Sequence, residues 1–127
     1  MMGVSSATVL VVDDDDDMRT VFTLSLGHVG YRVITASSSS EALRAAREEH
    51  PQAVVLDLSE RAADGWEVVR RLKASPATSD IPVVMVIGWA DLDYHKRDDN
   101  CAAYLPKPVR LEALCTAVDS AVRGLRS

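Results

Sequence analysis

The sequence predicts an α/β fold in which helices cover both faces of a five-stranded parallel sheet. Two observations lead to this class. Short apolar runs alternate along the chain with segments whose apolar residues recur at helical spacing. Each run is continuously apolar, which is typical of strands buried on both faces of a parallel sheet. The 127 residues suit one domain, expected over 1–127 with its core at about 7–125.

The chain begins with a strand, a helix and a second strand. Residues 9–12 are a run of Val and Leu, which predicts a buried strand. Over residues 17–29 apolar side chains recur at helical spacing, and Gly30 follows, as glycine does after many helices. Residues 31–35 are rich in β-branched and aromatic side chains and predict the second strand.

A helix, a strand and a further helix come next. Ser38 and Glu41 have the spacing of a capping box, so a helix is predicted over 39–49. This explains the local serine run better than a cluster of phosphorylation sites does. Residues 53–57 predict the third strand, and residues 64–73 carry apolar side chains at helical spacing.

The last part of the chain predicts two strands and two helices. Residues 82–87 and 102–105 are mostly apolar and predict the fourth and fifth strands. Residues 109–125 place apolar side chains on one helix face. A helix is also expected over 90–99, where Leu92 is the one large aliphatic residue among six charged ones. We therefore expect this fourth helix to be short or irregular.

Composition and charge exclude several classes of function. The net charge is −5, from 14 basic and 19 acidic residues, so direct binding of nucleic acid is not expected. The longest apolar stretch, residues 83–90, is far shorter than the roughly 20 residues of a membrane span. Cys101 and Cys115 lack metal-ligand spacing, and no signal-peptide pattern is found, so reduced thiols in the cytoplasm are expected.

Charged side chains follow three of the predicted strands. Five consecutive aspartates, residues 13–17, follow the first strand, Asp57 ends the third and Lys107 follows the fifth. The carboxyl ends of parallel strands form the functional edge of such sheets, so these side chains are expected to converge. Clustered carboxylates suit Mg²⁺, and a carboxylate beside Mg²⁺ can attack phosphorus to form an aspartyl phosphate. A lysine ammonium would balance the phosphoryl charge.

Each of these features has a plainer explanation when taken alone. Acidic residues favour a helix N-terminus, and Asp15, Asp16 and Asp17 are assigned to that role. A single Asp at a strand end is most often a turn residue, and Lys-Pro is most often part of a loop. Their combination at the ends of different strands is what favours phosphoryl chemistry.

In this combination the chain resembles a response-regulator receiver domain, the family of the chemotaxis protein CheY. The matching stretches are residues 9–14, 54–58, 64–65, 81–83 and 104–108. The resemblance covers roughly residues 7–125. It implies a flavodoxin-like, doubly wound five-stranded sheet with strand order 2-1-3-4-5 and five helices.

The resemblance also implies the roles of individual residues. Asp57 matches the phosphoacceptor, which is also a metal ligand, and Lys107 matches the lysine that contacts the phosphoryl group. Asp14 matches the carboxylate that binds Mg²⁺ directly, and Asp13 matches the one that acts mainly through metal-bound water. The backbone carbonyl of Ser59 matches the group that completes the metal shell.

Three further positions concern the switch and access to the site. Tyr104 falls where the family carries its switch aromatic, and the Lys107–Pro108 bond is expected to be cis. Ile87 stands where the family normally has Thr or Ser, so a charge-assisted hydrogen bond worth about 1.5–3 kcal/mol is absent. Trp89 is interpreted either as a lid over the acceptor or as a surface aromatic that fills a groove.

The function implied is two-component signal transduction by a regulatory phosphoacceptor, not by an enzyme with an external substrate. The phosphoryl group would come from a sensor histidine kinase, a phosphotransfer protein or a small phosphodonor. It would be relayed through an altered switch to an unknown downstream protein. Formation of a homodimer is left open, and a membrane is not an expected partner.

Two alternatives accompany this interpretation. The first is a pseudo-receiver, a docking module whose conformation is not controlled by phosphorylation, and Ile87 and the weak fourth helix favour it. A module without phosphotransfer would have little reason to keep the acidic pair, the acceptor and the lysine together. The second is a Mg²⁺-dependent hydrolase of the haloacid-dehalogenase type, with Asp13 as nucleophile and Asp15 as acid, although that architecture usually needs a longer chain.

Overall fold

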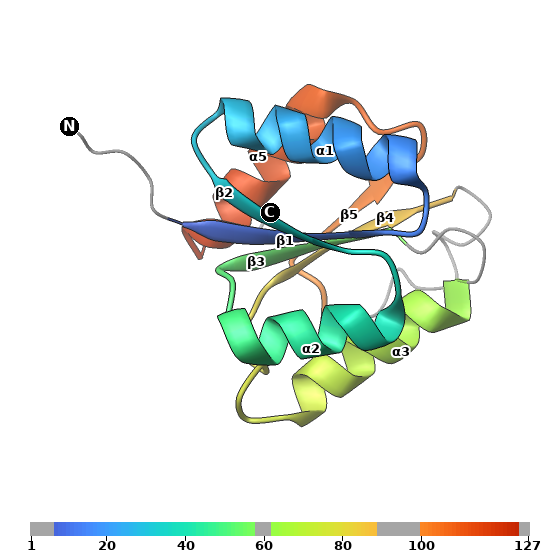
Figure 1. Ribbon diagram of the computed structural model, residues 1–127, viewed down its shortest axis with the longest axis vertical. Helices are drawn as coiled ribbons and strands as arrows, with labels where there is room; N and C mark the ends of the chain where they lie inside the picture. The colour runs from blue at the N-terminus through green and yellow to red at the C-terminus, as the bar shows by residue number, and fades with distance from the viewer. Residues whose placement is uncertain (1–6, 58–61, 89–99, 125–127) are drawn as a thin grey trace.

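The centre of the molecule is one five-stranded sheet. The structure is a computed structural model that describes residues 7–57, 62–88 and 100–124. All neighbouring strands are parallel, in the order β2-β1-β3-β4-β5 (Figure 1). The strands are β1 (Thr8–Asp13), β2 (Arg32–Ala36), β3 (Ala53–Asp57), β4 (Val83–Ile87) and β5 (Ala103–Pro106). The predicted sheet and its strand order are confirmed.

Helices cover both faces of this sheet. One face carries α1 (Asp16–His28) and α5 (Leu111–Val122), and the other carries α2 (Ser39–Glu49) and α3 (Ala62–Ala74) (Figure 1). The described residues contain these four helices, whereas five are predicted. The helix expected over 90–99 lies outside the described residues. Within the described ranges, no helix combines the length and apolarity needed to cross a membrane.

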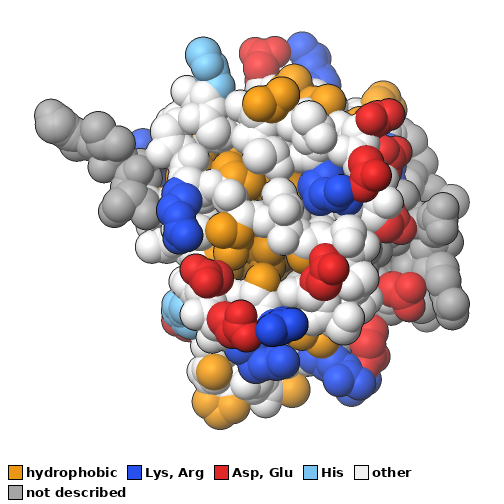
Figure 2. Space-filling view, viewed as in Figure 1, with side chains coloured by type: hydrophobic (Ala, Val, Ile, Leu, Met, Phe, Trp, Pro, Cys, Tyr) orange, Lys and Arg blue, Asp and Glu red, His pale blue; other side chains and the backbone are white. Residues whose placement is uncertain are grey.

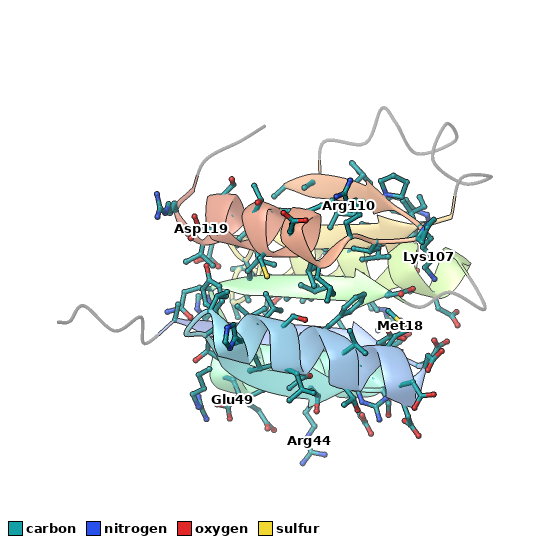
Figure 3. All side chains as sticks on the ribbon, turned by 90° about the horizontal axis from the view of Figure 1, so that it is seen from above. Met18, Arg44, Glu49, Lys107, Arg110 and Asp119 are labelled. Carbon is teal, nitrogen blue, oxygen red and sulfur yellow. The ribbon has the colours of Figure 1, made fainter. Side chains whose placement is uncertain are left out.

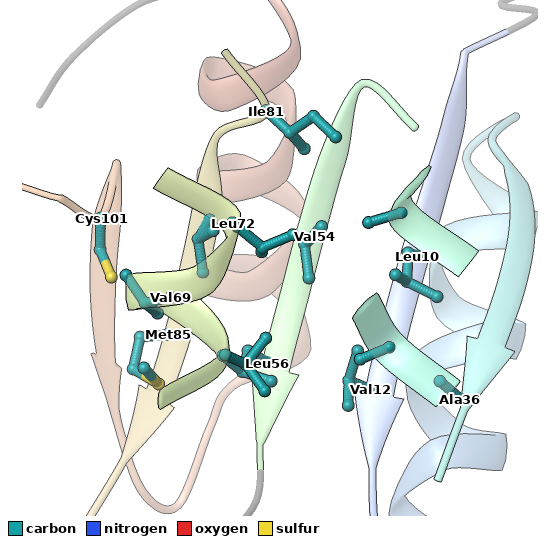
Figure 4. Close-up of a cluster of buried hydrophobic side chains, with 14 of the residues drawn as sticks. Leu10, Val12, Ala36, Val54, Leu56, Val69, Leu72, Ile81, Met85 and Cys101 are labelled. Atoms are coloured by element: carbon teal, nitrogen blue, oxygen red, sulfur yellow. The ribbon is translucent and has the colours of Figure 1, made fainter. Parts of the chain in front are cut away.

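The strands send alternate side chains into two hydrophobic clusters, because successive residues of a strand point to opposite faces. Leu10, Val54 and Met85 belong to the cluster that packs against α2 and α3 (Figure 4). Val9 and Val55 belong to the cluster that packs against α1 and α5. Each fully buried Leu or Phe contributes about 1.5–3 kcal/mol. Burial on both faces explains why the strands read as continuous apolar runs.

Local sequence signals set the ends of α1 and α2. Ser38 caps α2, since its hydroxyl oxygen accepts the backbone N–H of Glu41. The Glu41 carboxylate accepts the backbone N–H of Ser37, one residue earlier than in the ideal capping box. Gly30 follows α1 with φ +107°, in the region that favours glycine. The predicted helix over 39–49 is confirmed to the residue.

The last helix is shorter than predicted. A helix is predicted over 109–125, but Arg110 has extended backbone angles and serves as the N-cap, so α5 begins at Leu111. At the other end Gly124 takes a positive φ of 76°. Apolar periodicity alone does not reveal these changes of backbone direction, because Val109 packs on the core without being helical.

Candidate functional site

Two buried aspartates end neighbouring strands at the same level of the sheet. Asp13 of β1 is the register partner of Asp57 of β3. Their exposed fractions are 0% and 3%. Buried carboxylates are rare in protein interiors unless a partner compensates their charge. This pair therefore marks the edge of the sheet where chemistry is to be sought, and the predicted convergence of the two residues is confirmed.

Lys107 supplies a positive charge to this pair. Its Nζ lies 2.8 Å from Oδ1 of Asp57. Its backbone N–H donates to the carbonyl oxygen of Ile87 at 3.0 Å, which continues the pairing between β4 and β5. The Lys107–Pro108 peptide bond is cis, as predicted. The lysine is thus anchored through its backbone while its side chain reaches the carboxylate.

The run of five aspartates separates into different structural roles. Oδ1 of Asp13 accepts the backbone N–H of Asp15 at 2.9 Å and forms an Asx turn. The carboxylate of Asp15 accepts two N–H groups in the first turn of α1 and is its N-cap. Asp16 and Asp17 lie in that first turn, as predicted. Asp13 and the exposed Asp14 remain available to the site.

Burial and neighbouring negative charges raise the pKa values of the two buried aspartates. Burial raises the pKa of Asp13 to about 7, although the hydrogen bond from Asp15 lowers it, and the charges of Asp57 and Asp14 raise it further. Burial also raises the pKa of Asp57, while the hydrogen bond and charge of Lys107 act in the opposite direction. A group of carboxylates that repel one another in this way favours the binding of a cation.

The oxygen atoms at this edge fit a hard divalent cation. Oδ2 of Asp13 is buried and has no hydrogen-bond partner. The negative charge of Asp14 lies close enough to raise the pKa of Asp57. Carboxylate oxygens and water are the ligands that Mg²⁺ prefers. In the part of the chain that the structure describes, no three His, Cys, Asp or Glu side chains already form a metal-binding group. Ser59, the predicted carbonyl ligand, lies outside that part.

A cleft of about 450 Å³ opens onto these groups. Its lining combines charged and apolar side chains, namely Asp13, Asp15, Met18, Phe22, Asp57, Lys107, Pro108 and Val109. Met18 and Lys107 lie toward the same end of the molecule (Figure 3). Acidic side chains gather on the surface near the start of α1 (Figure 2). The volume of the cleft is within the size range of small-molecule sites.

The two predicted switch positions lie in one hydrophobic cluster. The side chain of Ile87 is buried in the cluster toward α2 and α3, and Tyr104 packs against the same cluster. The ring of Tyr104 lies 6.0 Å from that of Trp66 of α3, centroid to centroid, with 38° between the ring planes. Trp89, the predicted access residue, lies outside the described residues.

Arg19 is the neighbour of the site that sequence reasoning missed. Its Nη1 donates to the backbone carbonyl oxygen of Asp13 at 2.9 Å, and its Nη2 forms an ion pair with Asp16. The spacing of three residues between Asp16 and Arg19 is a signal for the ion pair. The contact with Asp13 depends on the path of the turn and has no sequence signal.

Comparison with known sequences identifies a family and several relatives. The profile of the response regulator receiver domain matches residues 9–119. The transcriptional regulatory protein PrrA of Mycobacterium tuberculosis is 37% identical over 123 residues, which are 95% of this chain and 52% of PrrA. The transcriptional regulatory protein AfsQ1 of Streptomyces coelicolor is 33% identical over 118 residues, 91% of this chain and 51% of AfsQ1. The chain thus spans about half the length of these relatives.

Solved structures share the same fold. A response regulator receiver domain protein from Clostridium thermocellum superposes with a TM-score of 0.81 at 28% identity, covering 93% of this chain and 95% of that one. The chemotaxis protein CheY4 of Vibrio cholerae has a TM-score of 0.78 at 24% identity, covering 92% and 99% of the two chains. The second likeness concerns the fold alone.

Proposed function

This chain belongs to the response regulator receiver domain family, and on that basis we propose that it accepts a phosphoryl group on Asp57. Members of this family are regulatory phosphoacceptors of two-component signal transduction rather than conventional enzymes. The observation that carries the proposal is the 2.8 Å contact between Lys107 and Asp57 at a cleft that also holds the carboxylate of Asp13.

In the proposed step, a carboxylate oxygen of Asp57 attacks the phosphorus of the donor. A new P–O bond forms as the donor's P–O bond (in an acyl phosphate) or P–N bond (in a phosphohistidine) breaks, and the bonding pair leaves with the donor. Lys107 exchanges its carboxylate partner for a phosphoryl oxygen and balances the charge. Mg²⁺, held by Asp13, Asp14 and Asp57, would neutralise charge on the phosphoryl oxygens.

We propose that the signal leaves this site by an altered route. Ile87 offers no hydroxyl to a phosphoryl oxygen, but its carbonyl accepts the backbone N–H of Lys107. Its side chain shares a cluster with Tyr104. A movement of Lys107 can therefore displace Ile87 of β4 through their backbone hydrogen bond, and Ile87 can displace Tyr104 of β5 through side-chain packing. The alternative that Ile87 favours is a docking module whose conformation does not depend on phosphorylation.

The hydrolase alternative is disfavoured by the use of Asp15. An acid that protonates a leaving group needs a free carboxyl, whereas the carboxylate of Asp15 accepts the backbone N–H of Asp17 at 2.9 Å and of Met18 at 3.3 Å. Asp15 is accordingly explained by its structural role.

We propose partners on the basis of the family and of the named relatives. A sensor histidine kinase or a phosphotransfer protein is the proposed donor. PrrA and AfsQ1 are named transcriptional regulators, which favours control of transcription as the downstream process. The net charge of −5 does not favour direct contact between this chain and DNA.

Phosphorylation by acetyl phosphate tests the proposal. The protein is incubated with Mg²⁺ and acetyl phosphate, and its intact mass is measured. We expect one added phosphoryl mass in the wild type, none in Asp57→Asn, and an unchanged gain in Asp80→Asn, a control at an exposed aspartate paired with His50. Equal labelling of Asp57→Asn would contradict the assignment. No labelling of a wild type that binds Mg²⁺ would support the docking module.

A further inference from the structure

We propose that Arg19 is a positioning residue for the magnesium site, holding the backbone of Asp13 so that the carboxylates of Asp13 and Asp14 face the bound cation. The inference rests on the proposed function, because it concerns the same site. Arg19 does not touch the phosphoryl group or the cation in this proposal. It acts through the turn that joins β1 to α1.

One guanidinium ties the end of β1 to the first turn of α1. Arg19 lies in α1, and its Nη1 reaches back to the carbonyl oxygen of Asp13 at 2.9 Å. Its Nη2 forms an ion pair with Asp16. The side chain of Arg19 is 22% exposed, against 86% for Asp16, so the arginine is largely covered while its partner is in water. The planar fork of arginine suits two fixed acceptors better than a lysine ammonium does.

Asp13 is held at two points, which leaves one oxygen for a ligand. Its Oδ1 accepts the N–H of Asp15, and its backbone oxygen accepts the guanidinium of Arg19. Its Oδ2 is buried without a hydrogen-bond partner. The carbonyl that Arg19 holds belongs to the planar peptide unit between Asp13 and Asp14. Arg19 therefore constrains the direction in which the chain enters Asp14 as well as the orientation of Asp13.

The positioning role and the charge of Arg19 have opposite effects on cation binding. A positive charge beside a cation site weakens binding through Coulomb repulsion, so its removal alone would tighten Mg²⁺ binding. Loss of a group that orients metal ligands weakens binding, typically by 10–100-fold. Weaker Mg²⁺ binding after removal of Arg19 thus indicates a positioning role, and tighter binding indicates a purely electrostatic effect.

Calorimetric titration with Mg²⁺ tests the proposal on the whole chain without any phosphodonor. We expect Arg19→Met to bind Mg²⁺ about tenfold more weakly than the wild type, at the lower end of the effect of such supporting groups. Arg44→Met is the matched control, because Arg44 forms an exposed pair with Glu48 on α2. Its affinity should change less than about twofold, as expected for an exposed surface charge. Unchanged or tighter binding by Arg19→Met would overturn the proposal, and so would an equal loss in both variants.

A second variant covers the case in which Arg19→Met does not fold, as judged by far-ultraviolet circular dichroism without Mg²⁺. Arg19→Lys keeps the charge but cannot hold both acceptors as a fork, so we expect about a threefold loss of affinity. Wild-type affinity in Arg19→Lys would overturn the proposal. A wild type that binds no Mg²⁺ would overturn the proposed function together with this inference, whereas binding that is insensitive to position 19 overturns the inference alone.

Discussion

The ammonium group of Lys107 lies 2.8 Å from Oδ1 of Asp57, and the two residues differ sharply in their exposure to solvent. The side chain of Asp57 is 4% exposed and that of Lys107 is 33% exposed. The carboxylate is thus a buried charge whose opposite partner stands at the mouth of the cleft. The partly exposed side chain of Lys107 is thus accessible to an incoming phosphate while its ammonium contacts Asp57.

Removal of Lys107 should destabilise the protein through Asp57. In Lys107→Met the buried carboxylate loses its opposite charge, and we expect a loss of about 1–3 kcal/mol in the free energy of unfolding, below the cost of breaking a fully buried pair. The same substitution in an Asp57→Asn background should cost much less. Urea denaturation of the four proteins gives the coupling energy. An equal cost in both backgrounds would show that the ion pair contributes nothing.

The effect of Mg²⁺ on stability should increase with pH. Folding raises the pKa of Asp13 from 3.8 to about 7, so the folded state holds this proton more tightly than the unfolded chain. The stabilisation from that proton is complete below about pH 4 and is lost as the pH rises to about 7. Mg²⁺ needs ionised ligands and therefore compensates for this loss.

Thermal denaturation with and without Mg²⁺ measures this dependence. We expect the increase in Tm caused by Mg²⁺ to be larger at about pH 8 than at about pH 5.5. Asp13→Asn removes this titrating group and should reduce the pH dependence of the metal-free protein, while the contribution of Asp57 remains. The same increase at both pH values in the wild type would show that protonation of Asp13 does not compete with the metal.

A hydroxyl at position 87 should strengthen the response to phosphorylation. Ile87→Thr keeps the branch at Cβ and adds a donor, and a hydrogen bond to a charged group shifts a two-state equilibrium by about tenfold or more. Ile87→Val is the matched control, because it also removes volume but adds no donor. The fluorescence of the two tryptophans reports the change, since the indole of Trp66 lies beside Tyr104. If the two variants respond alike, the missing hydroxyl is not what limits the switch.

The loop after α3 should depend on one buried hydroxyl. Oγ1 of Thr78 donates to the backbone carbonyl of Leu72 at 2.8 Å, and Thr78 is 1% exposed. We expect Thr78→Val to cost about 1–2 kcal/mol, because the carbonyl keeps no equivalent partner on that side. Thr20→Val removes an exposed hydroxyl bond within α1 and should cost less than about 0.5 kcal/mol. Urea denaturation compares the two, and similar costs would contradict the importance of burial here.

The sequence predicts the sheet well because its strands are buried on both faces. The strand over 53–57 is a short, continuously apolar run that ends in Asp57, and its predicted bounds are confirmed to the residue. The convergence of Asp13, Asp57 and Lys107 is also predictable, since strand order and direction bring strand ends together.

Other features of the site depend on tertiary contacts that leave no local pattern. Arg19 reads as an ordinary surface residue of an amphipathic helix until the turn before α1 brings the carbonyl of Asp13 within its reach. The placement of Ile87 and Tyr104 in one cluster follows from the pairing of β4 with β5 and from the position of α3. The length of α5 depends on the backbone of Arg110, which apolar spacing does not report.

The register that sets Asp13 opposite Asp57 also limits how this chain can change in length. Side chains of a strand alternate with a period of two, so one residue inserted within β1 would turn Asp13 to the opposite face. An insertion between Thr8 and Val9 would also exchange the members of the two hydrophobic clusters, sending Val9 and Val11 to the side now filled by Leu10 and Val12. The same alternation of side chains along β1 therefore places Asp13 in the site and the apolar residues in the two clusters. A substitution in β1 changes one side chain at a time, whereas a single insertion would disturb both the site and the packing of the core.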